Sequence, residues 1–229
     1  MRSILRLMQV ELPSAHYSTL SRRARTLSLS LTPAQRKIKH LVIDSSGLKV
    51  YGEGEWQMGT HRKQKRRQWR NLHISMDAGT HQLTAASITD KELLDRNALA
   101  GLLEETESEV ERVCADGAYD FEQCYRAIKQ KQAIALIPPR ADAVVRGRSP
   151  FEQRDENVRG IKSMGRKEWK KASTYHQRSL VECAFFRLKT IFPEKLRSRT
   201  METQTAEAKV RCMALNRITR LGMPKSYAV

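Results

Sequence analysis

Residues 40–47 read HLVIDSSG, and the fold prediction starts from this stretch. Leu41, Val42 and Ile43 form an unbroken apolar run of the kind that predicts a short buried strand. The run ends on a carboxylate, Asp44, and Gly47 follows as a turn residue. We therefore predict a strand at residues 40–44 that carries an acid at its carboxyl end, followed by a short segment at 48–51.

The rest of the chain alternates between strand-like and helix-like patterns. Residues 69–76 alternate apolar and polar side chains and residues 83–88 return after a turn, so the two predict a β-hairpin. Further segments are predicted as a helix at 91–105, a strand at 110–115, a helix at 121–130, a strand at 133–137, a basic irregular stretch at 140–174, a helix around Glu182 and a basic helix at 205–221. Strands alternating with helices predict an α/β fold, a mixed sheet with helices on both faces.

Two aspartates follow predicted strands, Asp44 after the first and Asp116 after the strand at 110–115. Ligand and catalytic groups of α/β sheets gather at the carboxyl ends of strands, so these two acids could meet there. Hard carboxylate oxygens suit Mg²⁺ or Mn²⁺ rather than zinc. Two such ions can activate an attacking oxygen and stabilise a leaving one at phosphorus. For either acid alone, turn chemistry is the alternative; nearby Asp120 is interpreted as a turn or cap residue.

A third acid, Glu182, belongs to a spaced set with Tyr175, Arg178 and Lys189. On an α-helix each residue advances by about 100°, which places all four on one stripe. The flank of that stripe is apolar and consists of Val181, Phe185, Leu188 and Phe192. A carboxylate beside phosphate-binding groups makes sense if a metal cation lies between it and the phosphate. The alternatives are solvated helix charges for Arg178 and Lys189 and a core position for Tyr175.

The charge of the chain predicts a polyanionic partner. The formal net charge is +17 and the pI is about 10.1, which favours nucleic acid. The positive charge is clustered at residues 61–70, 154–171 and 209–225, whereas 90–111 is acidic. In the first cluster we expect Arg62, Lys63, Lys65, Arg66 and Arg67 to contact DNA phosphates. Trp169, inside the second cluster, could stack on a splayed base, or could equally be a half-buried packing anchor.

The sequence favours the bacterial cytoplasm, with association with the nucleoid. No apolar run approaches the length of a membrane span, and residues 1–10 do not resemble a signal peptide. The four cysteines are scattered without a CxxC pair, which argues against a zinc ribbon and against a disulfide framework. We expect no membrane contact and no small-molecule cofactor.

Several of these motifs together resemble a known family. IDSSGLK at 43–49, GEW at 54–56, ADGAYD at 115–120 and the Tyr-Arg-Glu-Lys set are similar to DDE transposases of bacterial insertion sequences, most of all the insertion-sequence-five group. The similarity covers roughly residues 16–227. It implies a ribonuclease H-like fold in which Asp44, Asp116 and Glu182 are the catalytic triad and bind two Mg²⁺ (or Mn²⁺) ions. It also implies cleavage of double-stranded DNA by water at element ends, then strand transfer by the freed 3′-hydroxyl to target DNA, by a homodimer on DNA.

The resemblance also suggests a domain division. Residues 1–39 would be a short helical remnant of an N-terminal DNA-binding region, residues 40–200 the catalytic core, and residues 201–229 a basic helix and tail. Members of the family usually carry a longer N-terminal region, so a shortened copy is expected here. Two alternatives stay open: an inactive, truncated DNA-binding derivative, and a ribonuclease H-type nuclease without strand transfer.

Overall fold

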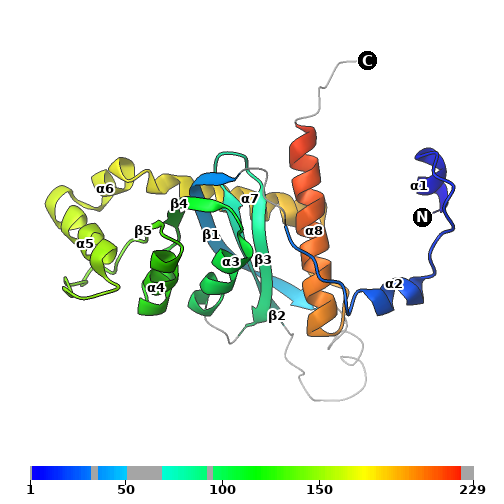
Figure 1. The fold of residues 1–229 in the computed structure, drawn as a ribbon, viewed down its shortest axis with the longest axis horizontal. Coiled ribbons are helices and arrows are strands. Elements are labelled where there is room, and N and C mark those ends of the chain that lie inside the picture. Colours follow the sequence, from blue (N-terminus) through cyan, green and yellow to red (C-terminus); the bar gives the residue numbers. More distant parts are fainter. Residues whose placement is uncertain (1, 32–35, 51–68, 92–94, 223–229) are drawn as a thin grey trace, which may run out of the picture.

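The centre of the protein is a six-stranded mixed sheet (Figure 1). The computed structural model describes residues 2–31, 36–50, 69–91 and 95–222. The strands are β1 (Lys37–Val50), β2 (Trp69–Asp77), β3 (Leu83–Asp90), β4 (Glu109–Cys114), β5 (Ile134–Leu136) and β6 (Lys195–Leu196). Their order is β3-β2-β1-β4-β5, and β6 pairs with β1 off this path.

The strand directions confirm the predicted mixture. β2 is antiparallel to both β1 and β3, which gives the predicted hairpin. β4 and β5 run parallel to β1 and to each other. The prediction of two segments at 40–44 and 48–51 was wrong, because β1 continues through Gly47, opposite Asn71. A Cβ at Gly47 would lie 3.3 Å from the Trp69 ring, so glycine lets this ring lie close against the strand.

Helices cover both faces of the sheet, as predicted. On one face, α3 (Leu99–Glu105) and α4 (Glu122–Gln130) pack with Leu41 and Ile43 in one core cluster. On the other face, α7 (Ser179–Ile191) and α8 (Met201–Leu221) pack with Val42 in a second cluster. Successive side chains of β1 are therefore buried in the cores on opposite faces of the sheet, which explains the unbroken apolar run in its sequence. This arrangement is that of a ribonuclease H-like α/β fold.

The prediction of an irregular stretch at 140–174 was wrong. The structure has two helices there, α5 (Glu152–Met164) and α6 (Arg166–Ala172). The buried residues of α5 are Arg154, Asp155, Asn157 and Val158. Three of the four are polar, so the helix lacks the apolar periodicity by which buried helices are predicted from sequence. We call residues 138–172 the insertion; it lies at the opposite end of the molecule from the N-terminal helices (Figure 1).

The two N-terminal helices are short, as predicted: α1 (Arg2–Leu7) and α2 (Tyr17–Arg23). α2 contributes no buried residue, whereas Leu31 is buried in the same core cluster as residues of α7 and α8. The division of the chain at residues 39 and 200 stays a prediction.

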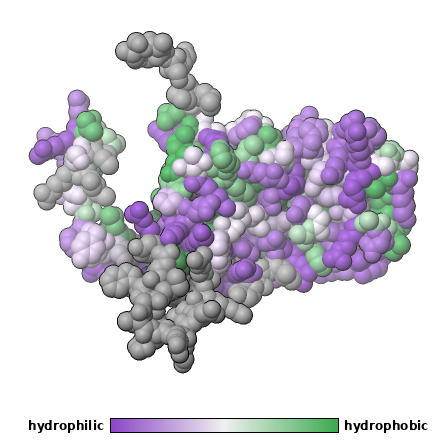
Figure 2. Space-filling model, turned by 180° about the vertical axis from the view of Figure 1, so that it is seen from behind, coloured by the Kyte–Doolittle hydropathy of each residue, from purple (hydrophilic) through white to green (hydrophobic). Residues whose placement is uncertain are grey.

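The back of the molecule is mainly hydrophilic (Figure 2). Hydrophobic side chains gather there near the C-terminal end of α8, where Ile218 and Leu221 are exposed. None of the helices in the described part of the chain is long and apolar enough to cross a membrane.

Candidate active site

Asp44 lies within β1 and Asp116 follows the end of β4, at the same height on these two neighbouring parallel strands. In the β1–β4 ladder, Val42 lies opposite Cys114, and each aspartate comes two residues later. The negative charge of Asp116 contributes to a raised pKa of Asp44, so the two carboxyl groups lie within electrostatic reach of each other. The structure thus brings the two acids to one place, the carboxyl edge of the sheet.

The Asp44 carboxylate is largely buried and is held from two sides. Its Oδ1 accepts a hydrogen bond of 2.9 Å from the Ser45 amide, and its Oδ2 lies 2.8 Å from Nη1 of Arg178. Burial raises the pKa of Asp44 above its ordinary value, and Asp116 adds to this rise, while Ser45 and Arg178 oppose it. A partly desolvated carboxylate beside a second one is a place where a cation is favoured.

Asp116 also has the turn role that the sequence left open. Its Oδ1 accepts from the Ala118 amide at 2.8 Å and caps the short 3-10 helix η2 (Gly117–Tyr119). This capping bond uses one of the two carboxylate oxygens and fixes the direction of the side chain. Turn chemistry and a role in the site are therefore compatible at this position.

Arg178 joins the late helix to the sheet. Its Nη2 lies 2.5 Å from Oε1 of Glu182 while its Nη1 holds Asp44, so one guanidinium bridges two of the three acids. Burial works against the charge of Arg178, but Asp44, Tyr175, Glu182 and Asp116 together outweigh it and raise the pKa. The three acids and the Tyr175 hydroxyl thus favour the same positive charge.

The set Tyr175, Arg178, Glu182 and Lys189 does not lie on one continuous α-helix. Tyr175–Arg178 form a 3-10 helix, η3, and α7 begins at Ser179. A 3-10 helix has three residues per turn, which rotates Tyr175 away from the predicted stripe. The left-handed backbone of Thr174, with φ of 59°, sets the entry into this turn. The predicted apolar flank is confirmed by the burial of Val181, Phe185 and Leu188.

Tyr175 and Lys189 lie at the two ends of this set. The Tyr175 ring is buried, and desolvation raises its pKa to about 12. Lys189 is seven residues beyond Glu182, about 10 Å along the helix axis, and its Nζ lies 4.0 Å from Oε1 of Glu194. Their predicted phosphate contacts stay predictions.

Trp169 lies in the core rather than on a DNA-facing surface. Only 5% of the residue is exposed, and its ring centroid is 5.7 Å from that of Tyr175. A Cβ at Gly160 would approach the indole to 3.0 Å, so the ring is packed on that side as well. The indole has no open face for a base, and its contacts agree with the alternative of a packing anchor.

Two further predictions concern the basic residues expected to bind DNA and the metal ions expected at the acids. The basic residues Arg62, Lys63, Lys65, Arg66 and Arg67 lie outside the described residues. Within the ranges that are described, no group of three or more His, Cys, Asp or Glu side chains is close enough together to hold a metal ion. The carboxylate donors nevertheless fit Mg²⁺ or Mn²⁺ in kind, and a guanidinium already occupies the space between two of them.

Asp120 has a role that its sequence position does not reveal. Asp120 is the C-cap of η2, so the prediction of a turn or cap residue is confirmed, and in addition its carboxylate pairs with Arg154 of α5 at 2.8 Å. Both side chains are buried, with exposures of 3% and 6%. The partner lies 34 residues away in sequence, so no local pattern links the two; the one available signal is an acid inside the ADGAYD motif.

The fold and the acids define a class: ribonuclease H-like α/β proteins with carboxylates on two neighbouring parallel strands and a late helix. A family model described as "Transposase DDE domain" matches residues 35–217 of this chain. A second model with the same description matches residues 1–53. The first match covers well over half of the sequence, and the chain belongs to the DDE transposase domain family. The family implies a phosphoryl-transfer enzyme and a DNA partner.

Proposed function

We propose that this protein cleaves DNA at the ends of an insertion sequence and joins the freed 3′-hydroxyl to target DNA, with Asp44, Asp116 and Glu182 as its catalytic acids. The observation that supports this most strongly is that Arg178 pairs with both Asp44 and Glu182, while the charge of Asp116 lies within electrostatic reach of the same guanidinium. Acids of β1 and α7 have no structural need to share one guanidinium, whereas phosphoryl transfer needs carboxylates at one point.

The three carboxylates would hold two Mg²⁺ or Mn²⁺ ions. Bound there, such ions supply Lewis acidity for the attacking and leaving oxygens of an in-line displacement. Asp44 is suited to the ligand role because it is directed by Ser45 and partly shielded from water. Asp116 is directed in the same way by its capping bond to Ala118.

Arg178 would change partners during the reaction. When cations neutralise Asp44 and Glu182, the guanidinium is free to bind a DNA phosphate, for which its planar, forked donors are well suited. Lys189 and the Tyr175 hydroxyl would hold neighbouring phosphates. We also propose that two copies act together on a pair of element ends.

The triad is tested by three isosteric substitutions: Asp44→Asn, Asp116→Asn and Glu182→Gln. Each should abolish Mg²⁺-dependent nicking of a labelled duplex and leave salt-sensitive DNA binding in place, because only the metal ligands are lost. The control is Glu168→Gln on α6, an exposed acid paired with Lys171, which should cleave normally. Continued cleavage by all three triad variants would refute the proposed site.

Strand transfer needs a separate assay, because a nuclease with the same acids would also nick DNA. A pre-cut element end with a free 3′-hydroxyl is offered together with supercoiled target DNA and Mg²⁺. The proposal expects joined products that depend on the 3′-hydroxyl and on Glu182. Cleavage without joined products would indicate a nuclease without strand transfer. DNA binding without cleavage or strand transfer would indicate an inactive derivative.

A further inference from the structure

The insertion contains a pocket of about 190 Å³ that is separate from the three acids. It lies between the segment that follows β5 and the helices α5 and α6. Its lining combines apolar residues, among them Pro139, Val158 and Ile161, with three cations, Arg140, Lys162 and Arg166. The apolar residues are buried or half-buried, whereas the three cations are exposed. No acid lines this pocket, which we call the insertion pocket.

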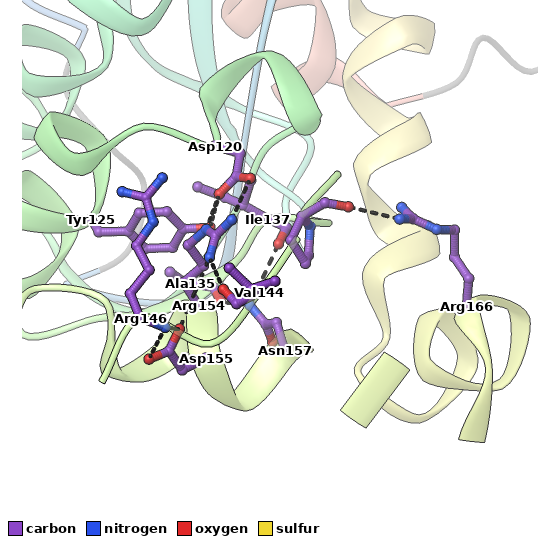
Figure 3. Close-up of polar contacts among 11 residues, drawn as sticks. Asp120, Tyr125, Ala135, Ile137, Val144, Arg146, Arg154, Asp155, Asn157 and Arg166 are labelled. Atoms are coloured by element: carbon purple, nitrogen blue, oxygen red, sulfur yellow. Dashed lines mark hydrogen bonds and ion pairs between the residues drawn. The ribbon is translucent and has the colours of Figure 1, made fainter. Parts of the chain in front are cut away.

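One hydrogen bond joins two walls of the insertion pocket, and several others hold the loop beside it (Figure 3). Arg166 donates to the carbonyl of Pro139 at 2.7 Å and so links α6 to the opposite wall. Buried Arg154 donates to the carbonyl of Val144 at 3.0 Å. The carboxylate of Asp155 accepts from the amides of Arg146 at 2.9 Å and Gly147 at 2.8 Å. Side chains of α5 therefore hold the neighbouring loop in one position, and the pocket is formed before any ligand arrives.

The same network connects the pocket to the turn of Asp116. Arg154 pairs with Asp120, which also accepts a hydrogen bond of 3.0 Å from the Tyr125 hydroxyl. Asp120 ends the turn that Asp116 begins. A Cβ at Gly117 would lie 3.3 Å from the carbonyl of Pro138, directly before the pocket wall. A DNA strand that reaches Asp116 would thus pass close to the insertion pocket.

Charge and size indicate the chemical class of the ligand. Three cations without a lining acid favour an anion, and the apolar side favours a flat or aliphatic group beside it. Pockets for whole small molecules usually measure about 300–1,000 Å³. The insertion pocket is smaller, and its size suits a single residue of a polymer, such as one nucleotide of a DNA strand, whose neighbours lie outside the pocket. A nucleotide within a DNA strand has both the phosphate and the apolar sugar or base face.

We propose that the insertion pocket binds one nucleotide of a DNA strand next to the active site, with its phosphate at Arg140 and Lys162. This inference rests on the proposed function, because it takes DNA as the partner. Arg166 has a different part, since its bond to Pro139 shapes the pocket.

The first test removes the two free cations in the double variant Arg140→Ala/Lys162→Ala. The matched control is Arg159→Ala/Lys167→Ala, which removes two exposed cations of α5 and α6 that do not line the pocket. Fluorescence anisotropy measures duplex affinity over a series of salt concentrations. We expect at least a tenfold loss for the pocket variant and a slope of log K against log salt reduced by about 0.9, the value for one phosphate contact. Equal losses in both variants would overturn the proposal.

The second test narrows the pocket without changing charge, by Ala143→Leu at a lining residue. We expect weaker DNA binding with an unchanged salt slope, because the apolar contact is lost and the phosphate contacts are not. If the variant has a wild-type circular dichroism spectrum and unchanged affinity for DNA, the proposal that the pocket binds a nucleotide is overturned. If free deoxynucleoside monophosphate binds tightly while the pocket variants bind DNA normally, the pocket is a small-molecule site and the proposal fails. The triad variants are measured in the nicking assay, so failure of the catalytic proposal is seen separately, as metal-dependent cleavage that survives their substitution.

Discussion

Arg178 is the residue whose surroundings say most about the site. Its guanidinium holds Asp44 and Glu182 at once, from a position that is mostly buried. A fixed positive charge between two carboxylates competes with any other cation for the same oxygens. If the three acids bind metal ions as proposed, Arg178 would stabilise the acids of the metal-free protein at the expense of metal affinity.

Arg178→Ala should raise the affinity of the DNA-free protein for Mg²⁺ or Mn²⁺ several-fold, because the competing charge is removed. Isothermal titration calorimetry measures this directly. The control is Lys171→Ala, which removes one exposed cation paired with Glu168 and should leave metal affinity unchanged. In the same Arg178 variant, the affinity for pre-cut ends should fall more, relative to the wild type, than the affinity for uncut duplex. Metal affinity equal to or weaker than that of the wild type would contradict the competition between Arg178 and the metal ions.

At the scale of elements, a buried ion pair, Arg154 with Asp120, contributes to holding α5 against the core. Arg154→Met leaves Asp120 buried without its partner, and removing one member of such a pair costs about 3–5 kcal/mol of unfolding free energy. Denaturant unfolding followed by circular dichroism checks this value. Arg154→Met/Asp120→Leu should recover a large part of the loss, since no charge is then stranded. Lys171→Ala, which breaks an exposed pair, should cost less than about 1 kcal/mol.

The strands β1 and β2 carry two buried histidines, His40 and His73. Burial lowers the pKa of His73 below its ordinary value of 6.5, although Asp95 opposes this, and burial with Arg112 lowers that of His40. The unfolded chain then binds more protons than the folded protein at pH values just below 6.5. Stability should therefore fall as the pH decreases from about 6.5 through the folded-state pKa values.

His73→Gln tests this pH dependence, because glutamine can still donate to Thr89, which lies 2.8 Å from Nε2 of His73. The unfolding free energy of this variant should fall less between pH 7 and pH 5 than that of the wild type. His176→Gln changes an exposed histidine and should follow the wild-type curve. A His73 variant with the wild-type pH profile would show that the destabilisation arises elsewhere.

At the scale of the whole molecule, the net charge of +17 governs how the protein meets DNA. If six to ten phosphates are neutralised, affinity should fall by about 10³–10⁵-fold between 50 and 200 mM salt. Anisotropy titrations with unrelated duplexes measure this, and the loss should be similar for all of them because the contacts are to phosphates. Affinity that hardly changes with salt would argue against this electrostatic mode.

The amino-acid sequence by itself determined the elements that depend on near neighbours in the chain. Local patterns were enough to predict the mixed sheet and to place Asp44 near Asp116: the apolar run at Leu41–Ile43 that ends on Asp44, the alternation in β2, and Asp116 after β4. Tertiary structure alone decided the contacts between distant residues. Arg178 bridges acids of two elements, Asp120 pairs with Arg154, and α5 buries polar side chains that no apolar periodicity predicts. The physical reason is that the free energy of a buried charge depends on its partner in space, and chain spacing does not reveal that partner.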